Sequence, residues 1–193
     1  MELSSEEEAL FVAISFGKIH RIEKLLQQVD DLNVRSLKDQ TPLVYVCHVL
    51  SGAICSHVTR MLLKQKSCDP NARDGKGKTA LMYASMDKDK CDAVRILVRN
   101  RACDTNLMDE NGYTALMHAV ANDNMDAVDI LLFCPRVVCK VDVNMHSLSG
   151  ATATDLAVES RNARCCQTLV KRAGADVTLV HDVALLNTLL AKT

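Results

Sequence analysis

The sequence of 193 residues contains no tryptophan, and aromatic residues make up only 3% of it. A core with so few rings must be filled by Leu, Val, Ile, Ala and Met, and the hydrophobic content of 48% supplies enough of them. Small and straight side chains suit thin helices that pack closely in layers. The composition therefore favours a core of layered helices.

The chain also lacks a long hydrophobic run and an excess of charge of one sign. Its longest apolar stretch, 9–14, is far too short to span a bilayer, and residues 1–8 are acidic where a secretory signal would be basic. The 23 basic and 24 acidic residues are mixed and leave a formal net charge of −1. Without a basic stripe, binding to a phosphate backbone has little electrostatic support. We expect a soluble cytoplasmic protein, small enough to enter a nucleus, that binds neither nucleic acid nor membranes.

Catalytic motifs are missing as well. The sequence has no G-x-S-x-G, P-loop or H-E-x-x-H motif, and its six histidines are scattered. Cys47 and His48 are adjacent, but neighbouring side chains on a helix point in different directions and cannot form a nucleophile–base pair. We therefore predict a protein that is not an enzyme and uses no cofactor and no small-molecule substrate.

The nine cysteines do not indicate a disulfide framework, because their number is odd and no C-x-x-C pair occurs. Several occupy positions that suit a small apolar residue, which favours reduced thiols in a core. Cys134 and Cys139 flank an extended loop, with His146 beyond them. A thiol-based redox sensor or a metal site at this loop is the alternative function, although three ligands at such wide spacing are few for zinc.

What the sequence does contain is a phrase that recurs around Thr41, Thr79, Thr114 and Thr152, at intervals of 38, 35 and 38 residues. It reads Thr-Pro-Leu in the first copy, Gly-Lys-Thr-Ala-Leu-Met in the second and Gly-Tyr-Thr-Ala-Leu-Met in the third. Self-similarity at this period is typical of stacked repeat arrays, which work by presenting a surface.

Each copy predicts two helices and a projecting hairpin. A threonine hydroxyl can cap a helix, and Pro42 fits the first helical position because its missing N–H is not needed there. We expect first helices at about 42–48, 80–86, 115–121 and 153–159, each followed by a second helix with an apolar stripe. An earlier unit fits with Ser5 and Glu8 as a capping box, and a last helix is expected at 181–191.

These residues make the chain resemble the ankyrin-repeat family over about residues 5–180. The resemblance implies an all-α solenoid of stacked helix–turn–helix units with projecting hairpin loops. It places a single domain at 1–193, with repeats at 5–37, 38–75, 76–110, 111–148 and 149–180 and a C-terminal cap at 181–193. The family's His of T-P-L-H, which stitches neighbouring hairpins, is replaced in every copy, so we expect lower local rigidity. Its replacements are Phe11, Val44, Met82, Met117 and Asp155.

The resemblance also implies that a partner meets the hairpin tips and the concave face of the first helices. In register, these positions are the residue before each threonine and the fourth, seventh and eighth residues after it. All three tyrosines of the chain fall on this set, and tyrosine is enriched at interface hot spots. Tyrosine also fills half-exposed helix positions without binding anything. The tip charges are mixed in sign, which favours a protein partner over a polyanion.

We therefore predict a monomeric, non-catalytic protein-interaction module, an adaptor or a masking inhibitor. The predicted partner-binding residues are Tyr45, His48, Lys78, Tyr83, Met86, Tyr113, His118 and Asn122.

Overall fold

The computed structural model describes residues 3–135 and 139–191, and within these ranges the regular structure is entirely helical. In chain order the elements are α1 (Ser5–Ser15), α2 (Ile19–Leu25), α3 (Pro42–Val49), α4 (Gly52–Leu62), α5 (Ala80–Ser85), η1 (Lys88–Lys90), α6 (Cys91–Val98), α7 (Ala115–Ala121), α8 (Met125–Phe133), α9 (Ala153–Glu159), α10 (Ala163–Gln167), η2 (Thr168–Arg172), η3 (Val177–Leu179) and α11 (Val183–Leu190). Within the described ranges, no helix has both the length and the apolar character needed to cross a membrane.

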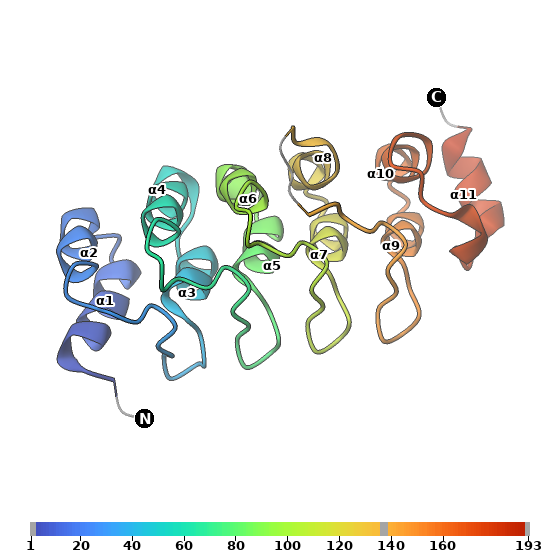
Figure 1. Ribbon diagram of the computed structural model, residues 1–193. Helices are drawn as coiled ribbons and strands as arrows, with labels where there is room; N and C mark the ends of the chain where they lie inside the picture. The colour runs from blue at the N-terminus through green and yellow to red at the C-terminus, as the bar shows by residue number, and fades with distance from the viewer. Residues whose placement is uncertain (1–2, 136–138, 192–193) are drawn as a thin grey trace.

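The helices stack in two rows (Figure 1). The inner row runs from α1 through α3, α5 and α7 to α9, and each of these helices packs against the next. The outer row contains α2, α4, α6 and α8, while α11 packs on α10 at the C-terminal end. Hairpin loops project from the inner row, all on the same side (Figure 1). The predicted all-α solenoid is confirmed, whereas the exact repeat boundaries stay a prediction.

The repeated threonines begin the inner helices, as predicted. The hydroxyls of Thr41, Thr79, Thr114 and Thr152 each accept a hydrogen bond from the backbone N–H three residues later. This bond satisfies a donor that the first turn of a helix would otherwise leave free. Leu43, Leu81 and Leu116 follow at the same register and are fully buried, so cap and core contact recur together.

Two predicted helix starts are wrong by one or two residues. The capping box of α1 consists of Ser4 and Glu7 in place of Ser5 and Glu8. Both serines precede a glutamate at the same spacing, so the pattern could not choose between them. At the other end, the last helix begins at Val183, because the side chain of Asp182 caps it by accepting from the N–H of Leu185 at 2.8 Å.

Asparagine side chains connect neighbouring hairpins where the family's histidine is absent. Asn71 donates from Nδ2 to the carbonyl of Ala102 at 2.6 Å and accepts from the N–H of Asp104 at 2.8 Å. Asn33 and Asn106 form the same two bonds to the unit that follows each of them. The expected loss of rigidity stays a prediction, and these bonds tie each unit to the next at a different place from the missing histidine.

The hairpin tips also touch each other, and glycine permits this close approach. Gly112 has a φ of +76°, and a Cβ added to it would lie 2.6 Å from the backbone nitrogen of Leu148. That nitrogen donates to the carbonyl of Asn111 at 3.0 Å. Gly77 has a φ of +72° and also makes a close approach, with an added Cβ 2.9 Å from the nitrogen of Glu110. The tips therefore form a continuous row beside the inner helices.

Candidate functional site

The predicted binding residues lie on α3, α5 and α7 and on the hairpins that precede these helices. We call the surface formed by these three helices and their hairpins the hairpin face. Its middle is a group of five contacting side chains, the central cluster, which spans two neighbouring units. The central cluster consists of Gln40, His48, Lys78, Tyr83 and Met86.

Ring stacking joins the two halves of the central cluster. The rings of His48 on α3 and Tyr83 on α5 are 4.6 Å apart between centroids and tilted by 30°. Gln40 places its side-chain nitrogen 3.1 Å from Nδ1 of His48. Lys78 lies with its Nζ 5.7 Å from the centre of the Tyr83 ring and 3.9 Å from the sulfur of Met86. The structure thus brings four predicted residues together with Gln40.

The hydroxyl of Tyr83 is bound to the protein itself. It donates to Oδ2 of the buried Asp74 at 2.7 Å, while Oδ1 of Asp74 accepts from the N–H groups of Lys76 and Lys78 at 2.9 Å each. Burial alone would raise the pKa of Asp74, but these hydrogen bonds, with Tyr83 the strongest, outweigh it and lower the pKa. The tyrosine therefore holds its hairpin, and its ring is fixed in place on the surface.

His118 on α7 repeats this arrangement one unit later. Its Nε2 lies 2.9 Å from Oδ2 of Asp109, whose Oδ1 accepts from the N–H groups of Asn111 and Tyr113. Burial lowers the pKa of His118 and outweighs the opposing effect of its hydrogen bond to Asp109, so the neutral ring is favoured. With 8% of its surface exposed, His118 supports Tyr113, whose ring lies 5.4 Å away.

The other two predicted residues lie at the edges of the hairpin face. Tyr45 is half-buried, its hydroxyl lies 2.7 Å from Oγ of Ser15, and its ring meets Phe11 edge to face at 5.4 Å. Asn122 is exposed at the end of α7, where Nδ2 donates to the carbonyl of His118 at 2.8 Å. Both are therefore within reach of a partner, although neither belongs to the central cluster.

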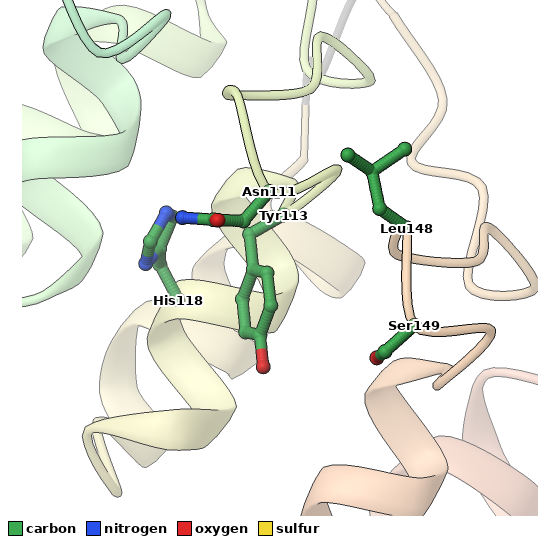
Figure 2. A pocket seen from close by; sticks show the side chains of 5 residues that line it. All are labelled: Asn111, Tyr113, His118, Leu148 and Ser149. Atoms are coloured by element: carbon green, nitrogen blue, oxygen red, sulfur yellow. The ribbon is translucent and has the colours of Figure 1, made fainter.

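An open pocket of about 640 Å³ lies next to Tyr113. It is lined by Asn111, Tyr113, His118, Leu148 and Ser149. Figure 2 shows Tyr113 on one side and the hairpin residues Leu148 and Ser149 on the other. Leu148 is 79% exposed, so an apolar side chain entering this pocket would cover it.

Comparison with protein-family models gives a match to ankyrin repeats, over residues 10–106 and 86–181. The chain belongs to the ankyrin-repeat family. Ankyrin repeats are generally protein–protein interaction modules and are generally not catalytic. A comparison with curated protein sequences gives no match. Family membership therefore supplies the type of function, and the side chains of the hairpin face must supply its particulars.

Exposed apolar residues of the first ankyrin unit were missed by the sequence prediction. Phe16 is 71% exposed at the end of α1, and Val12 is exposed one turn earlier. Val49 is exposed on α3, the next helix of the inner row. The register itself gives the signal, because Val12 and Phe16 are the fourth and eighth residues after Glu8, the counterpart of the capping threonines. The prediction applied this register only to the four units with a capping threonine, where it included Val49, and not to the first unit.

Lys90 is a second residue that the sequence did not reveal. Its Nζ is buried and donates to the carbonyl of Cys47 at 2.9 Å and to that of His48 at 3.3 Å, and it pairs with Asp87 at 3.2 Å. It thereby binds carbonyls at the C-terminal end of α3, where cations are favoured. A lysine in the charged stretch 87–90 would ordinarily be expected in solvent, so only the structure shows that it fixes His48.

The cysteine alternative gains no support from the described residues. Cys134 and Cys139 both carry free thiols, and Sγ of Cys139 lies 3.6 Å from Oδ1 of Asp104. The loop residues 136–138 between them lie outside the described ranges. In the part of the chain that is described, no three His, Cys, Asp or Glu side chains are grouped to hold a metal ion.

Proposed function

We propose that this ankyrin-repeat protein is a non-catalytic adaptor or masking inhibitor that binds a protein partner through its concave face and hairpin tips. It acts as a monomer in the cytoplasm, with access to the nucleus. The predicted binding residues are Tyr45, His48, Lys78, Tyr83, Met86, Tyr113, His118 and Asn122. The observation that carries the proposal is the central cluster, in which side chains from two neighbouring units form one connected surface.

This surface is organised before any partner arrives. Tyr83 is held by Asp74 and stacked on His48, while Tyr113 packs beside the immobile ring of His118. Immobilising a mobile side chain on binding costs about 0.5–1.5 kcal/mol, and a ring that is already fixed avoids most of that cost. Tyrosines in this condition are the type of residue that dominates binding energy at interfaces.

The test is affinity capture of the partner from native cell extract, followed by titration of the captured protein. Combining Tyr83→Ala with Tyr113→Ala should weaken binding by about tenfold or more, since two interface tyrosines each contribute on the order of 1 kcal/mol or above. Thermal unfolding must show that the double variant remains folded. Binding within about threefold of the unmodified protein would place the interface elsewhere.

Two variants serve as controls for this experiment. Arg60→Ala combined with Arg99→Ala removes two exposed side chains of the outer row and should leave binding unchanged. Tyr83→Phe keeps the stacked ring but loses the hydroxyl that binds Asp74, so it should lose only the advantage of a fixed ring, a few-fold in affinity and less than the double variant. A loss in the arginine variant would place the interface on the outer row. A loss in Tyr83→Phe as large as that of the double variant would show that the bond to Asp74, and not contact with the ring, accounts for the effect.

A further inference from the structure

Three lysines at the edge of the central cluster carry positive charge that the protein does not neutralise. Lys38 and Lys76 occupy the third position before a capping threonine, and Lys78 is the residue just before Thr79. Among the ion pairs formed within residues 3–135 and 139–191, none includes these lysines. Their ammonium groups are therefore available to a ligand.

The carboxylates around the lysines are already engaged. Asp39 pairs with Arg35 at 3.3 Å, and Asp87 pairs with Lys90 at 3.2 Å. Asp74 is buried and accepts bonds from Tyr83 and the hairpin backbone. Asp74 and Asp109 are buried beneath the face and offset part of the positive charge there. At the exposed surface the carboxylate near the three lysines is that of Glu110, at the tip of the next hairpin, whose backbone N–H binds the carbonyl of Lys76. The exposed part of this surface is therefore positive.

The positive charge is felt at the rings of the face. Lys78 lies with its Nζ 5.7 Å from the centre of the Tyr83 ring, which is stacked on His48. Burial lowers the pKa of His48, and Lys38, Lys90 and Lys76 lower it further, while Asp74 opposes them. Lys78 in turn contributes to the lowered pKa of His118, against the opposing effect of Asp109. Charge and aromatic surface therefore belong to one site.

We propose that Lys38, Lys76 and Lys78, together with the His48–Tyr83 stack, dock an acidic segment of the partner protein, in which Asp or Glu alternates with apolar side chains. This inference rests on the proposed function and names the chemistry of the partner. Carboxylates meet the three lysines, and the apolar side chains cover the rings and Met86. Helices pack about 10 Å apart, so two neighbouring units span roughly 20 Å, which about six residues of extended chain can cross.

The strength of exposed ion pairs sets what the lysines contribute to binding. An exposed ion pair stabilises a complex only slightly, so the rings supply most of the affinity and the lysines supply selectivity and the rate of association. Removing all three charges should therefore weaken binding by about tenfold and flatten its dependence on salt. A polyanion such as nucleic acid would gain from the charge but would find no further basic stripe beside it.

The experiment is selection from a library of random peptides, about twelve residues long, displayed on phage and panned on the full chain. The expected result is enrichment of peptides in which Asp or Glu accompanies apolar or aromatic residues. A selected peptide should lose about tenfold in affinity when Lys38→Gln, Lys76→Gln and Lys78→Gln are combined. The matched control combines Lys24→Gln, Lys64→Gln and Lys66→Gln, which removes the same charge from exposed lysines of α2 and the end of α4 and should bind normally.

The other outcomes contradict the inference in distinguishable ways. Neutral or basic peptides that still depend on Tyr83 and Tyr113 would overturn the acidic segment and leave the proposed function standing. Acidic peptides that ignore the tyrosine double variant would overturn both. An absence of any enriched peptide, or equal loss in the control lysine variant, overturns the inference. A single-stranded oligonucleotide of deoxythymidine that binds more tightly than the selected peptide would show a nucleic-acid site instead.

Discussion

Substituting two glycines of the hairpin row separates the effect of backbone conformation from that of hairpin contact. Gly112 and Gly150 both have positive φ, +76° and +84°, so alanine is strained at either position. The left-handed conformation costs an alanine about 1–2 kcal/mol, of which about 0.4–1 kcal/mol is offset because the unfolded chain loses freedom. Gly150→Ala, whose added Cβ meets nothing within 4 Å, should therefore lower the free energy of unfolding by about 1 kcal/mol.

Gly112→Ala must cost more, because its added Cβ meets backbone that cannot rotate away. The new carbon would lie 2.6 Å from the nitrogen of Leu148 and 2.9 Å from the carbonyl carbon of Ser147. The next hairpin has to move, which breaks the 3.0 Å bond from Leu148 to Asn111. The overpacking and the lost bond add about 1–3 kcal/mol, for a total of about 2–4 kcal/mol.

Urea denaturation followed by far-UV circular dichroism measures both losses, and amide hydrogen exchange locates them. Repeat arrays can lose cooperativity, so the exchange of the Leu148 amide is the more local readout. It should become faster in Gly112→Ala and remain protected in Gly150→Ala. Equal destabilisation of the two variants, with equal protection of Leu148, would refute the idea that tip contacts hold the hairpin row.

Three further variants test single groups. Tyr83→Phe should lower the free energy of unfolding by about 1–2 kcal/mol in urea titrations, since it deprives a buried carboxylate of a donor, and an unchanged midpoint would contradict this. Burial alone would raise the pKa of Asp155, but hydrogen bonds from His181 and Thr152 outweigh it and lower this pKa. The ionised carboxylate therefore stabilises the fold above its ordinary pKa of about 4, and this contribution is lost as the pH falls through the lower pKa of the folded state. In Asp155→Asn the free energy of unfolding should accordingly fall less steeply between neutral and acidic pH. A pH dependence like that of the unmodified protein would argue against the hydrogen bonds of Asp155 to Thr152 and His181. Lys90→Met should lower the free energy of unfolding by about 2–3 kcal/mol in thermal and urea unfolding. The control Lys88→Met, which removes an exposed ion pair, should lower it by less than about 1 kcal/mol, and similar losses in the two variants would contradict the role of the buried ammonium.

Most of the scaffold could be predicted from the sequence because its signals are local. A threonine cap with a leucine two residues later specifies where each inner helix starts and which side it buries, and both act within one turn. The start of α1 shows the limit of such signals. Ser4 and Ser5 offer the same spacing to a glutamate, and the choice between them depends on how the helix packs.

The candidate site was predicted as a set of positions but not as a set of contacts. Register placed Tyr83 and His118 on one face, yet it could not show that both bind an aspartate in their own hairpin. That pairing depends on how the hairpin folds back over the helix. The burial of Lys90 was missed for a similar reason, since it depends on the neighbouring unit of the stack, whereas the exposed Phe16 was missed because the register was not applied to the first unit.

A partner that binds as proposed occupies the hairpin face between α3 and α7. Amide chemical shifts, measured by NMR while a selected peptide or the captured partner is added to the isotope-labelled chain, test this residue by residue. We predict that the largest shifts fall on the hairpins and inner helices around Gln40, His48, Lys78, Tyr83 and Tyr113. Shifts concentrated on the outer helices α4, α6 and α8, with these five amides unmoved, would show that the partner binds elsewhere.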